Sequence, residues 1–323
     1  MRAAIVVIAL ATAACAPATS LDTSLPRVSD KPTFAWSEPM NGRSVLFVGA
    51  HPDDEWGVAP LLADACVDHG ASCHFVVASE AKSFGCLPTM GLRDPIECSR
   101  IRRDEMRASA SLFGGQVEFF GWEDLFYSYN DAGLERTLAD WAKAGGGHAA
   151  LVDRFERVLR RRRPDVVFTM DPRHGSTCHS SHRAVAMLLL EAVDRLPAAQ
   201  RPVVWLEQTD NIDERSEAIA SVNARLGYAR WPDTASETVY YDANKRLGTG
   251  RSAYDYALAV RRAHRSQYPD EASGKVKTAA AASERWVPLA SASSFRPADY
   301  CTSLSLERPT FDIPGNKERF GIE

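Results

Sequence analysis

The stretch Ser44-Val-Leu-Phe-Val-Gly-Ala-His-Pro-Asp-Asp-Glu55 decides the fold. Its apolar, β-branched-rich part, residues 45–48, stops at a Gly-Ala turn and predicts a buried strand. An imidazole and two carboxylates follow the strand directly: His51, Asp53 and Asp54. Ligands bind at the carboxyl edge of open parallel sheets, so this loop is a candidate site. Because Pro52 fixes its own φ and restrains the residue before it, we expect a stiff loop.

His51 and Asp54 have the donor types of a metal site. Neutral imidazole and carboxylate are ordinary zinc ligands, and a catalytic zinc takes three protein ligands and keeps one position open. Three residues apart on a turn, the two side chains can face one ion. Asp53 then projects differently and is placed to act as a general base. The motif alone leaves a second interpretation equally open, a turn followed by a helix N-cap at Asp53 or Asp54.

Strands alternate with helices over most of the chain. Apolar runs predict strands at 45–48, 73–78, 116–120, 165–170, 203–207 and 238–241. Helical spacing predicts helices at 56–69, 99–113, 149–163, from 183 onward and at 251–266. Such alternation favours an α/β fold, a Rossmann-like open and mostly parallel sheet with helices on both faces. The first strand lacks a Gly-x-Gly-x-x-Gly turn, so the sequence gives little support for dinucleotide binding.

A second polar cluster follows the strand predicted at 165–170. The chain has eight histidines, and three of them lie between positions 174 and 182. The cluster comprises Asp171, His174, Cys178, His179 and His182. His179 and His182 flank a predicted helix start, one turn apart on one side. One of the two would complete a zinc site with the first loop, leaving the other free; local hydrogen bonding at a helix start is the alternative.

Composition bounds the class of protein. The chain has 323 residues, of which 45% are hydrophobic and 25% charged, as in ordinary globular proteins. A net charge of −4 gives no electrostatic case for nucleic acid. No stretch after the first twenty residues is long and apolar enough to span a bilayer. We predict no protein partner.

Residues 1–14 have the pattern of an export signal. One positive charge precedes a short apolar run and small residues, and Cys15 follows. The arrangement resembles a bacterial lipoprotein signal, although Thr12 departs from its usual Leu and leaves ordinary secretion open. We therefore expect an exported protein of the periplasm or cell envelope, contacting membrane only through a lipid anchor at Cys15. Residues 15–43 then form a proline-containing tether.

Cysteine usage agrees with export. The chain has seven cysteines, and removing Cys15 as an anchor leaves an even number, which suits disulfides in an oxidising compartment. Proximity in sequence favours Cys66–Cys73 and Cys86–Cys98, and elimination leaves Cys178–Cys301.

Four motifs together resemble one enzyme family. They are Ala50-His-Pro-Asp-Asp-Glu55 after a strand, His179-x-x-His182 opening a helix, Arg102-x-x-Glu105, and His264-Arg-Ser-Gln267. The pattern is similar to the PIG-L/LmbE-like superfamily of zinc-dependent N-acetylglucosaminyl de-N-acetylases, over roughly residues 44–270. His264 itself remains open between a role at the site and a role in packing.

The resemblance implies a role for each matching residue. His51, Asp54 and His182 match the metal ligands, for Zn²⁺ or alternatively Fe²⁺. Asp53 matches the general base, and His179 the histidine that assists the oxyanion or the leaving amine. Arg102 matches an arginine on the substrate side. Two departures bear on the choice of substrate: Ser180-Ser181 replaces a Pro-Asp pair, and Ser79-Glu80-Ala81 replaces Thr-Asp-Gly.

These observations predict metal-assisted hydrolysis of the acetamide of an N-acetylated sugar by a domain of residues 44–285. Residues 286–323 would be an extension packed on that domain. One alternative is another zinc amidase or an esterase acting on a peptide or O-acetyl group. Others are a lipid-anchored carbohydrate-binding protein without turnover and a structural lipoprotein. The presence of Asp53 favours an enzyme.

Overall fold

A computed structural model describes residues 32–79, 94–123, 131–172, 175, 179–208, 238–269 and 286–292. Several predictions from the sequence concern residues outside these ranges. They are the export signal, the anchor Cys15, most of the tether, and the roles of Cys86, His174, Cys178 and Cys301.

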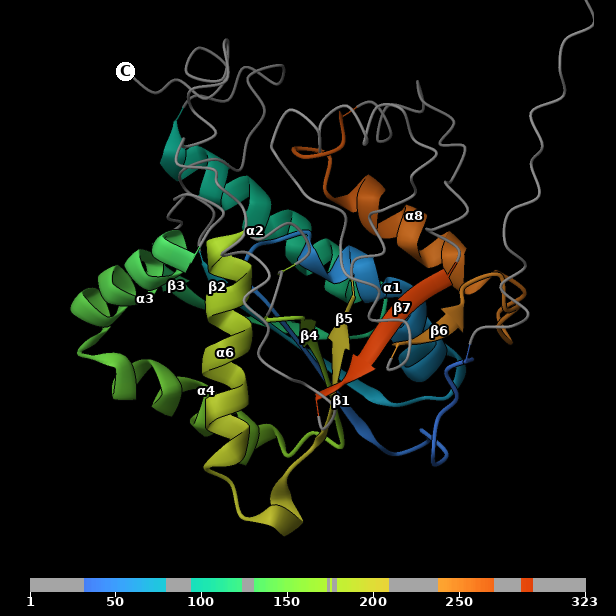
Figure 1. The fold of residues 1–323 in the computed structure, drawn as a ribbon. Coiled ribbons are helices and arrows are strands. Elements are labelled where there is room, and N and C mark those ends of the chain that lie inside the picture. Colours follow the sequence, from blue (N-terminus) through green and yellow to red (C-terminus); the bar gives the residue numbers. More distant parts are fainter. Residues whose placement is uncertain are drawn as a thin grey trace, which may run out of the picture. The chain divides into compact units, whose positions relative to one another are not determined.

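Within the described residues, one sheet of seven strands forms the centre of the fold, in the order β3-β2-β1-β4-β5-β7-β6 (Figure 1). The strands are β1 (Ser44–Gly49), β2 (Ser72–Ser79), β3 (Gln116–Trp122), β4 (Val166–Met170), β5 (Val203–Glu207), β6 (Thr238–Asp242) and β7 (Trp286–Ser291). The pairs among β1 to β5 are parallel, whereas β7 is antiparallel to both β5 and β6. The predicted α/β class and the six predicted strands are confirmed.

Strand β1 is buried on both faces, as expected for a strand inside a parallel sheet. Its alternate residues enter different hydrophobic cores: Val45 and Phe47 belong to one, Leu46 and Val48 to the other. Each of these four side chains is at most 1% exposed. The continuous apolar run that predicted the strand thus reflects two-sided burial.

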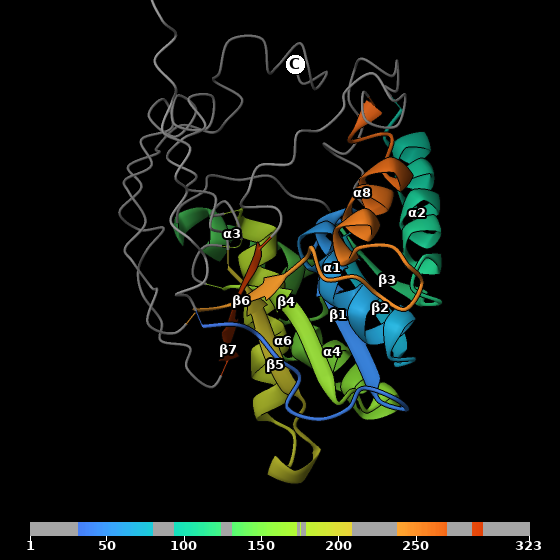
Figure 2. The same cartoon turned by 90° about the vertical axis from the view of Figure 1, so that its right-hand side faces the viewer.

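Helices cover both faces of the sheet (Figure 2). The first core lies between the sheet and α1 (Ala59–Leu62), α2 (Pro95–Ser111) and α8 (Ala253–Ala263). The second lies between the sheet and α3 (Asp131–Gly145), α4 (His148–Arg162) and α6 (Ser180–Asp194). Three shorter segments are η2 (Asp54–Val58), η3 (Ala63–Asp68) and η5 (Ala198–Gln200). Of the described helices, none is long and apolar enough to cross a membrane.

Some boundaries differ from the prediction. The helix expected over 56–69 consists of η2, α1 and a π-helical turn, η3. Helix α3 was not predicted. Trp286–Ser291, which the sequence analysis assigned to an extension beyond the domain, forms a strand inside the sheet. The end of the predicted tether also joins the fold, because Thr33 bridges to Tyr240 and Phe34 lies in the first core.

A disulfide joins Cys66 to Cys73, which confirms that predicted pair. It links η3 to the start of β2, across a short loop. Cys98 is also disulfide-bonded. Its predicted partner, Cys86, lies outside the described residues.

Candidate metal centre

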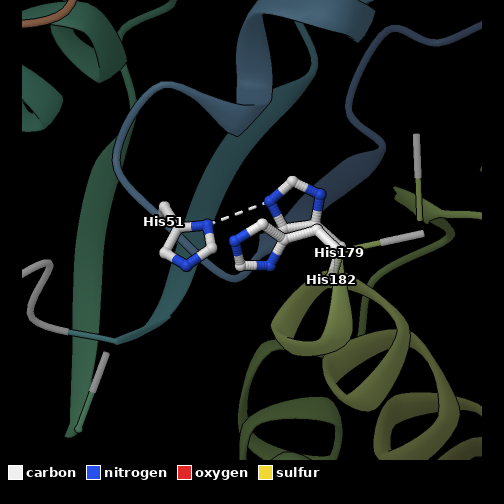
Figure 3. A group of neighbouring side chains, drawn as sticks. All are labelled: His51, His179 and His182. Atoms are coloured by element: carbon white, nitrogen blue, oxygen red, sulfur yellow. Dashed lines mark hydrogen bonds between the residues drawn. The ribbon is translucent and has the colours of Figure 1, made fainter. Parts of the chain in front are cut away.

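The candidate site lies where the strand order reverses. Strand β1 pairs with β2 on one side and with β4 on the other. From β1 the next strand in the chain is β2, and from β4 it is β5, so the two connections run in opposite directions across the sheet. Such a switch point opens a crevice at the sheet edge. His51 follows β1, and His179 and His182 stand at the start of α6, after β4. Topology therefore brings the two sequence clusters together (Figure 3).

Three donor atoms form a small triangle. His51 Nδ1 lies 2.9 Å from His182 Nε2 and 3.7 Å from Asp54 Oδ1. His182 Nε2 lies 3.3 Å from Asp54 Oδ1. Bonds of about 2.0–2.1 Å to a tetrahedral zinc would separate neighbouring donors by about 3.3 Å. The distances bracket this value, so the donor set fits a zinc ion.

Neighbouring groups orient two of these donors. Gly175 O lies 2.8 Å from His182 Nδ1, so Nδ1–H donates to it and Nε2 keeps its lone pair for the site. Asp54 Oδ2 accepts from the backbone N–H groups of Ala50 and His51 at 2.7 and 2.8 Å, which leaves Oδ1 facing the histidines. The Gly175 carbonyl thus provides the orienting contact that the sequence, lacking an aspartate between the histidines, did not offer.

Two glycines allow this close packing. A Cβ at Gly49 would lie 2.9 Å from the Asp54 Cβ. Gly175 has φ +47°, and a Cβ there would lie 2.8 Å from the His182 Cβ. A side chain at either position would displace a candidate ligand.

His179 is the N-cap residue of α6 and lies beside the triangle. Its ring stacks on His182 with centroids 4.5 Å apart and meets the His51 ring edge-on at 4.9 Å. A nitrogen from each of the three histidines falls in a group no more than 4.8 Å across, so His179 is an alternative donor to Asp54. Burial, reinforced by His182 and His51, lowers the pKa of His179 well below its ordinary value. The neutral imidazole is therefore favoured.

Asp53 and Asp54 differ in their protonation. Burial raises the pKa of Asp53, and the charge of Asp54 adds to this against the opposing effect of Arg102. Burial acts in the same direction on Asp54, but His182 and His51 outweigh it and hold the pKa of Asp54 well below its ordinary value. Asp54 thus carries the negative charge beside the histidines, and Asp53 is the more basic carboxylate, as a general base requires.

Arg102 is placed against the loop. Its Nη2 donates to Asp53 Oδ1 at 2.8 Å and to the Pro52 carbonyl oxygen. The residue is only 4% exposed. These contacts are internal to the protein, and the predicted contact of Arg102 with substrate stays a prediction.

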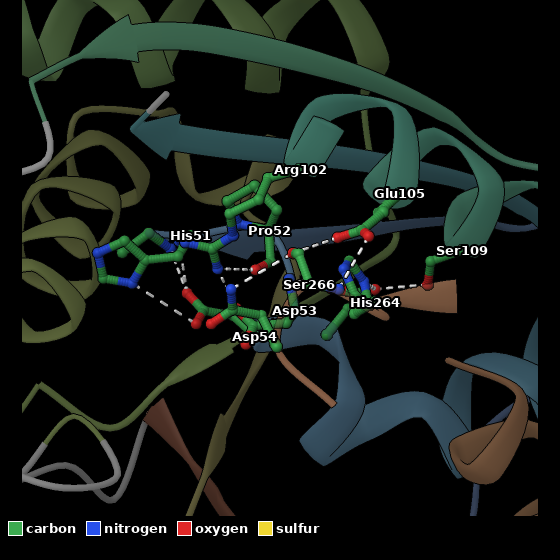
Figure 4. A network of polar contacts seen from close by, with 12 residues as sticks. His51, Pro52, Asp53, Asp54, Arg102, Glu105, Ser109, His264 and Ser266 are labelled. Atoms are coloured by element: carbon green, nitrogen blue, oxygen red, sulfur yellow. Dashed lines mark hydrogen bonds and ion pairs between the residues drawn. The ribbon is translucent and has the colours of Figure 1, made fainter. Parts of the chain in front are cut away.

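The structure adds a buried polar cluster that the sequence analysis did not assign (Figure 4). Its members are Glu55, Glu105, Ser109, His264 and Ser266. Glu55 raises the pKa of His264, although burial opposes the shift. In the sequence, the Arg102-x-x-Glu105 and His264-Arg-Ser-Gln267 motifs contain parts of this cluster. The spacing of 102, 105 and 109 also places three polar side chains on one face of a helix.

Glu207 is a further unassigned carboxylate, at the carboxyl end of β5. It lies over Gly57, where an added Cβ would collide with the carboxylate. Burial and the charge of Asp54 raise the pKa of Glu207 to about 8. No hydrogen bond or ion pair joins its side chain to another described residue.

Fold and site together define the class: an α/β protein with a candidate metal centre at the carboxyl edge of a Rossmann-like sheet. Residues 46–193 match the family model described as PIG-L: GlcNAc-PI de-N-acetylase. This match agrees with the family that the motifs predicted. The matched residues contain the whole donor triangle.

Several known proteins are similar to this chain. A probable N-acetyl-alpha-D-glucosaminyl L-malate deacetylase 2 of Bacillus cereus is 25% identical over 76% of this chain and 95% of its own length. The solved N,N'-diacetylchitobiose deacetylase of Pyrococcus horikoshii is 20% identical, with a TM-score of 0.47 over 75% of this chain and 77% of its own. A deacetylase of teicoplanin biosynthesis, solved with teicoplanin, is 13% identical, with a TM-score of 0.48 over 77% and 97%.

Proposed function

We propose that the protein is a zinc-dependent de-N-acetylase that hydrolyses the acetamide of an N-acetylglucosamine-containing glycan or glycoconjugate. The donor triangle of His51, Asp54 and His182 is the observation that carries the proposal. The PIG-L family match and the deacetylase named among its relatives support the choice of reaction.

His51, Asp54 and His182 would hold the metal. A zinc ion held there would lower the pKa of a bound water to about 7 and polarise a carbonyl oxygen. The orienting contacts of Gly175 and of the loop backbone keep the donor atoms turned inward without rearrangement. The donor atoms therefore already have the orientation that a bound metal would need.

Asp53 would take the proton of the attacking water. Its Oδ1 is held by Arg102, and its Oδ2 makes no hydrogen bond to another described residue. Its raised pKa brings it closer to the range in which a carboxylate accepts a proton efficiently. Neutral His179 would donate an N–H to the oxygen on which charge develops. The proton held by Asp53 would finally pass to the leaving sugar amine.

Acetate release tests this proposal directly. Purified protein would be incubated with N-acetylglucosamine, short chitin oligomers and peptidoglycan fragments, then treated with a chelator and resupplied with zinc. We expect acetate that disappears on chelation and returns with zinc. Release that persists in the fully metal-free protein would contradict zinc dependence. If zinc binds but no acetate appears from any substrate, the de-N-acetylase proposal is wrong.

We further propose that the protein is exported and anchored by a lipid on Cys15. The signal-like residues 1–14 support this, and so does the Cys66–Cys73 disulfide, which suits an oxidising compartment. In a bacterial host, the parent should sediment with membranes and Cys15→Ala should be soluble in the periplasm. Equal sedimentation of both would count against the anchor.

A further inference from the structure

The face of the His51–Glu55 loop that points away from the histidines rests on the buried polar cluster. Figure 4 shows Arg102, Glu105 and Ser109 reaching from α2, with His264 and Ser266 beside them. Residues far apart in the chain meet here, since His264 and Glu55 are 209 positions apart. Ser266 fixes the segment after α8 by donating its backbone N–H to Glu105 at 2.9 Å.

Glu55 is the centre of this cluster. Its Oε1 accepts from Ser109 Oγ and lies 2.6 Å from His264 Nε2. Glu55 and His264 are both 0% exposed. A carboxylate without solvent is costly unless donors surround it, so this one is held in a single place by its partners.

The other oxygen of Glu55 acts on Asp53. Oε2 accepts the backbone N–H of Asp53 at 3.2 Å. Asp53 has φ 106°, a left-handed conformation that costs a non-glycine residue of order 1–3 kcal/mol. Such strain persists only where the surroundings hold it. Glu55 holds the backbone, and Arg102 holds the carboxylate.

We propose that Glu55 is a positioning residue for Asp53, and that His264 and Ser109 fix Glu55 in turn. The inference rests on the proposed function, in which Asp53 accepts the proton of the attacking water. Without Glu55 the peptide at Asp53 can relax out of the left-handed region, and the carboxylate moves away from the water that it must deprotonate.

The test compares two buried carboxylates. Glu55→Ala removes the acceptor of the Asp53 N–H. Asp64→Ala is the matched control, because Asp64 is also only 1% exposed and accepts from Trp36 Nε1 and Lys245 Nζ. Among the described residues, Asp64 forms no hydrogen bond or ion pair with Asp53 or Glu55. Both variants lose stability, and only the first should lose catalysis.

We expect Glu55→Ala to lower kcat for acetate release about 10- to 100-fold, since misplacement by about 1 Å can cost about 100-fold. KM and zinc content should stay near those of the parent. Glu55→Gln should recover most of the rate, because its amide oxygen can accept from Asp53. Its NH₂ group can donate to Ser109 Oγ after the hydroxyl rotates, and to Nε2 of a neutral His264, since the variant removes the charge that raises the pKa of His264. Asp64→Ala should keep kcat within about 3-fold of the parent. An equal loss in both alanine variants would overturn the proposal.

A double-mutant cycle shows whether Glu55 acts through Asp53. In an Asp53→Asn background, removal of Glu55 should cost no further rate, since residues acting as a unit are not additive. An undiminished loss in that background would overturn the proposal. Ser109→Ala is the gentler variant if Glu55→Ala does not fold. It should lower kcat a few-fold in the parent and not in Asp53→Asn.

Amide exchange separates this inference from the proposed function. In metal-free protein, the Asp53 amide should exchange faster in Glu55→Ala than in the parent or in Asp64→Ala. If the parent releases no acetate but this difference appears, the proposed function fails and the support of Asp53 by Glu55 stands. Unchanged exchange in a folded Glu55→Ala variant would refute the support itself.

Discussion

Two clusters of histidine and aspartate in the described part of the protein have the composition of metal sites, and they differ in which of their atoms neighbouring groups bind. The first is the group of His51, Asp54, His179 and His182. The second is the group of Asp64 and Asp68 on η3 and His69 directly after it. Both gather their donor atoms within a few ångströms, so composition and proximity alone do not distinguish them.

The second cluster already uses its oxygens within the fold. Asp64 accepts from Trp36 Nε1 at 2.9 Å and forms an ion pair with Lys245. Asp68 Oδ1 accepts the backbone N–H of Gly248. In the first cluster, by contrast, the partners bind the outer atoms, Asp54 Oδ2 and His182 Nδ1, and turn the remaining atoms inward. A metal site is thus recognised by where its lone pairs point.

Removing one histidine from each cluster should give the largest difference in zinc content and in activity. His182→Ala should lose the bound zinc and lower acetate release by more than about 1,000-fold, because it removes the donor that the Gly175 carbonyl turns toward His51 and Asp54. His69→Ala should retain one zinc per chain and near-parental activity. Metal content by mass spectrometry, with activity, distinguishes them. Full zinc occupancy in His182→Ala would refute its role.

Asp53→Asn separates metal binding from proton transfer. The amide cannot accept the proton of the attacking water, so kcat should fall about 100- to 10,000-fold. Zinc content should match that of the parent, since Asp53 is outside the donor triangle. Turnover at the parental rate would contradict the general-base assignment. Loss of zinc would instead make Asp53 a ligand.

Lys245→Ala tests whether the second cluster contributes to stability and not to activity. Asp64, only 1% exposed, would lose its cation, and leaving a buried acceptor unsatisfied costs about 1–3 kcal/mol. We expect a lower free energy of unfolding in urea with unchanged kcat per bound zinc. A change in zinc-dependent activity would show that the two clusters are coupled.

Glu207→Gln tests a smaller, pH-dependent effect near the first cluster. The pKa of Glu207 is raised from 4.5 to about 8, so between these values the folded protein holds a proton that the unfolded chain releases. Stability therefore falls as pH rises, by up to about 1.4 kcal/mol per pH unit. Metal-free Glu207→Gln should lack this component. Urea titrations between about pH 5 and pH 8 measure the free energy of unfolding. The same dependence on pH in the parent and in Glu207→Gln would contradict the raised pKa.

Much of the fold could be predicted because local pattern and tertiary environment agree. The run at 45–48 is apolar because β1 is buried on both faces. Strand β7 was not predicted, because Pro288 interrupts its apolar run and a proline argues against a strand inside a sheet. Helix α3 did carry a signal, Leu134, Leu138 and Trp141 at helical spacing, beside a glycine-rich break.

The candidate site was predictable to the extent that its residues share a short motif. His51, Asp53 and Asp54 are adjacent in the chain, and His179 and His182 mark a helix start. The support of Asp53 was not predictable. Its parts come from α2 and the end of α8, and only folding brings them under the loop.

The most direct test of the central claim is a crystal structure of zinc-loaded protein, with anomalous scattering recorded at the zinc edge. We predict one peak bonded to His51 Nδ1, Asp54 Oδ1 and His182 Nε2. A peak bonded to His179 in place of Asp54, or a single peak at Asp64, Asp68 and His69, would contradict it.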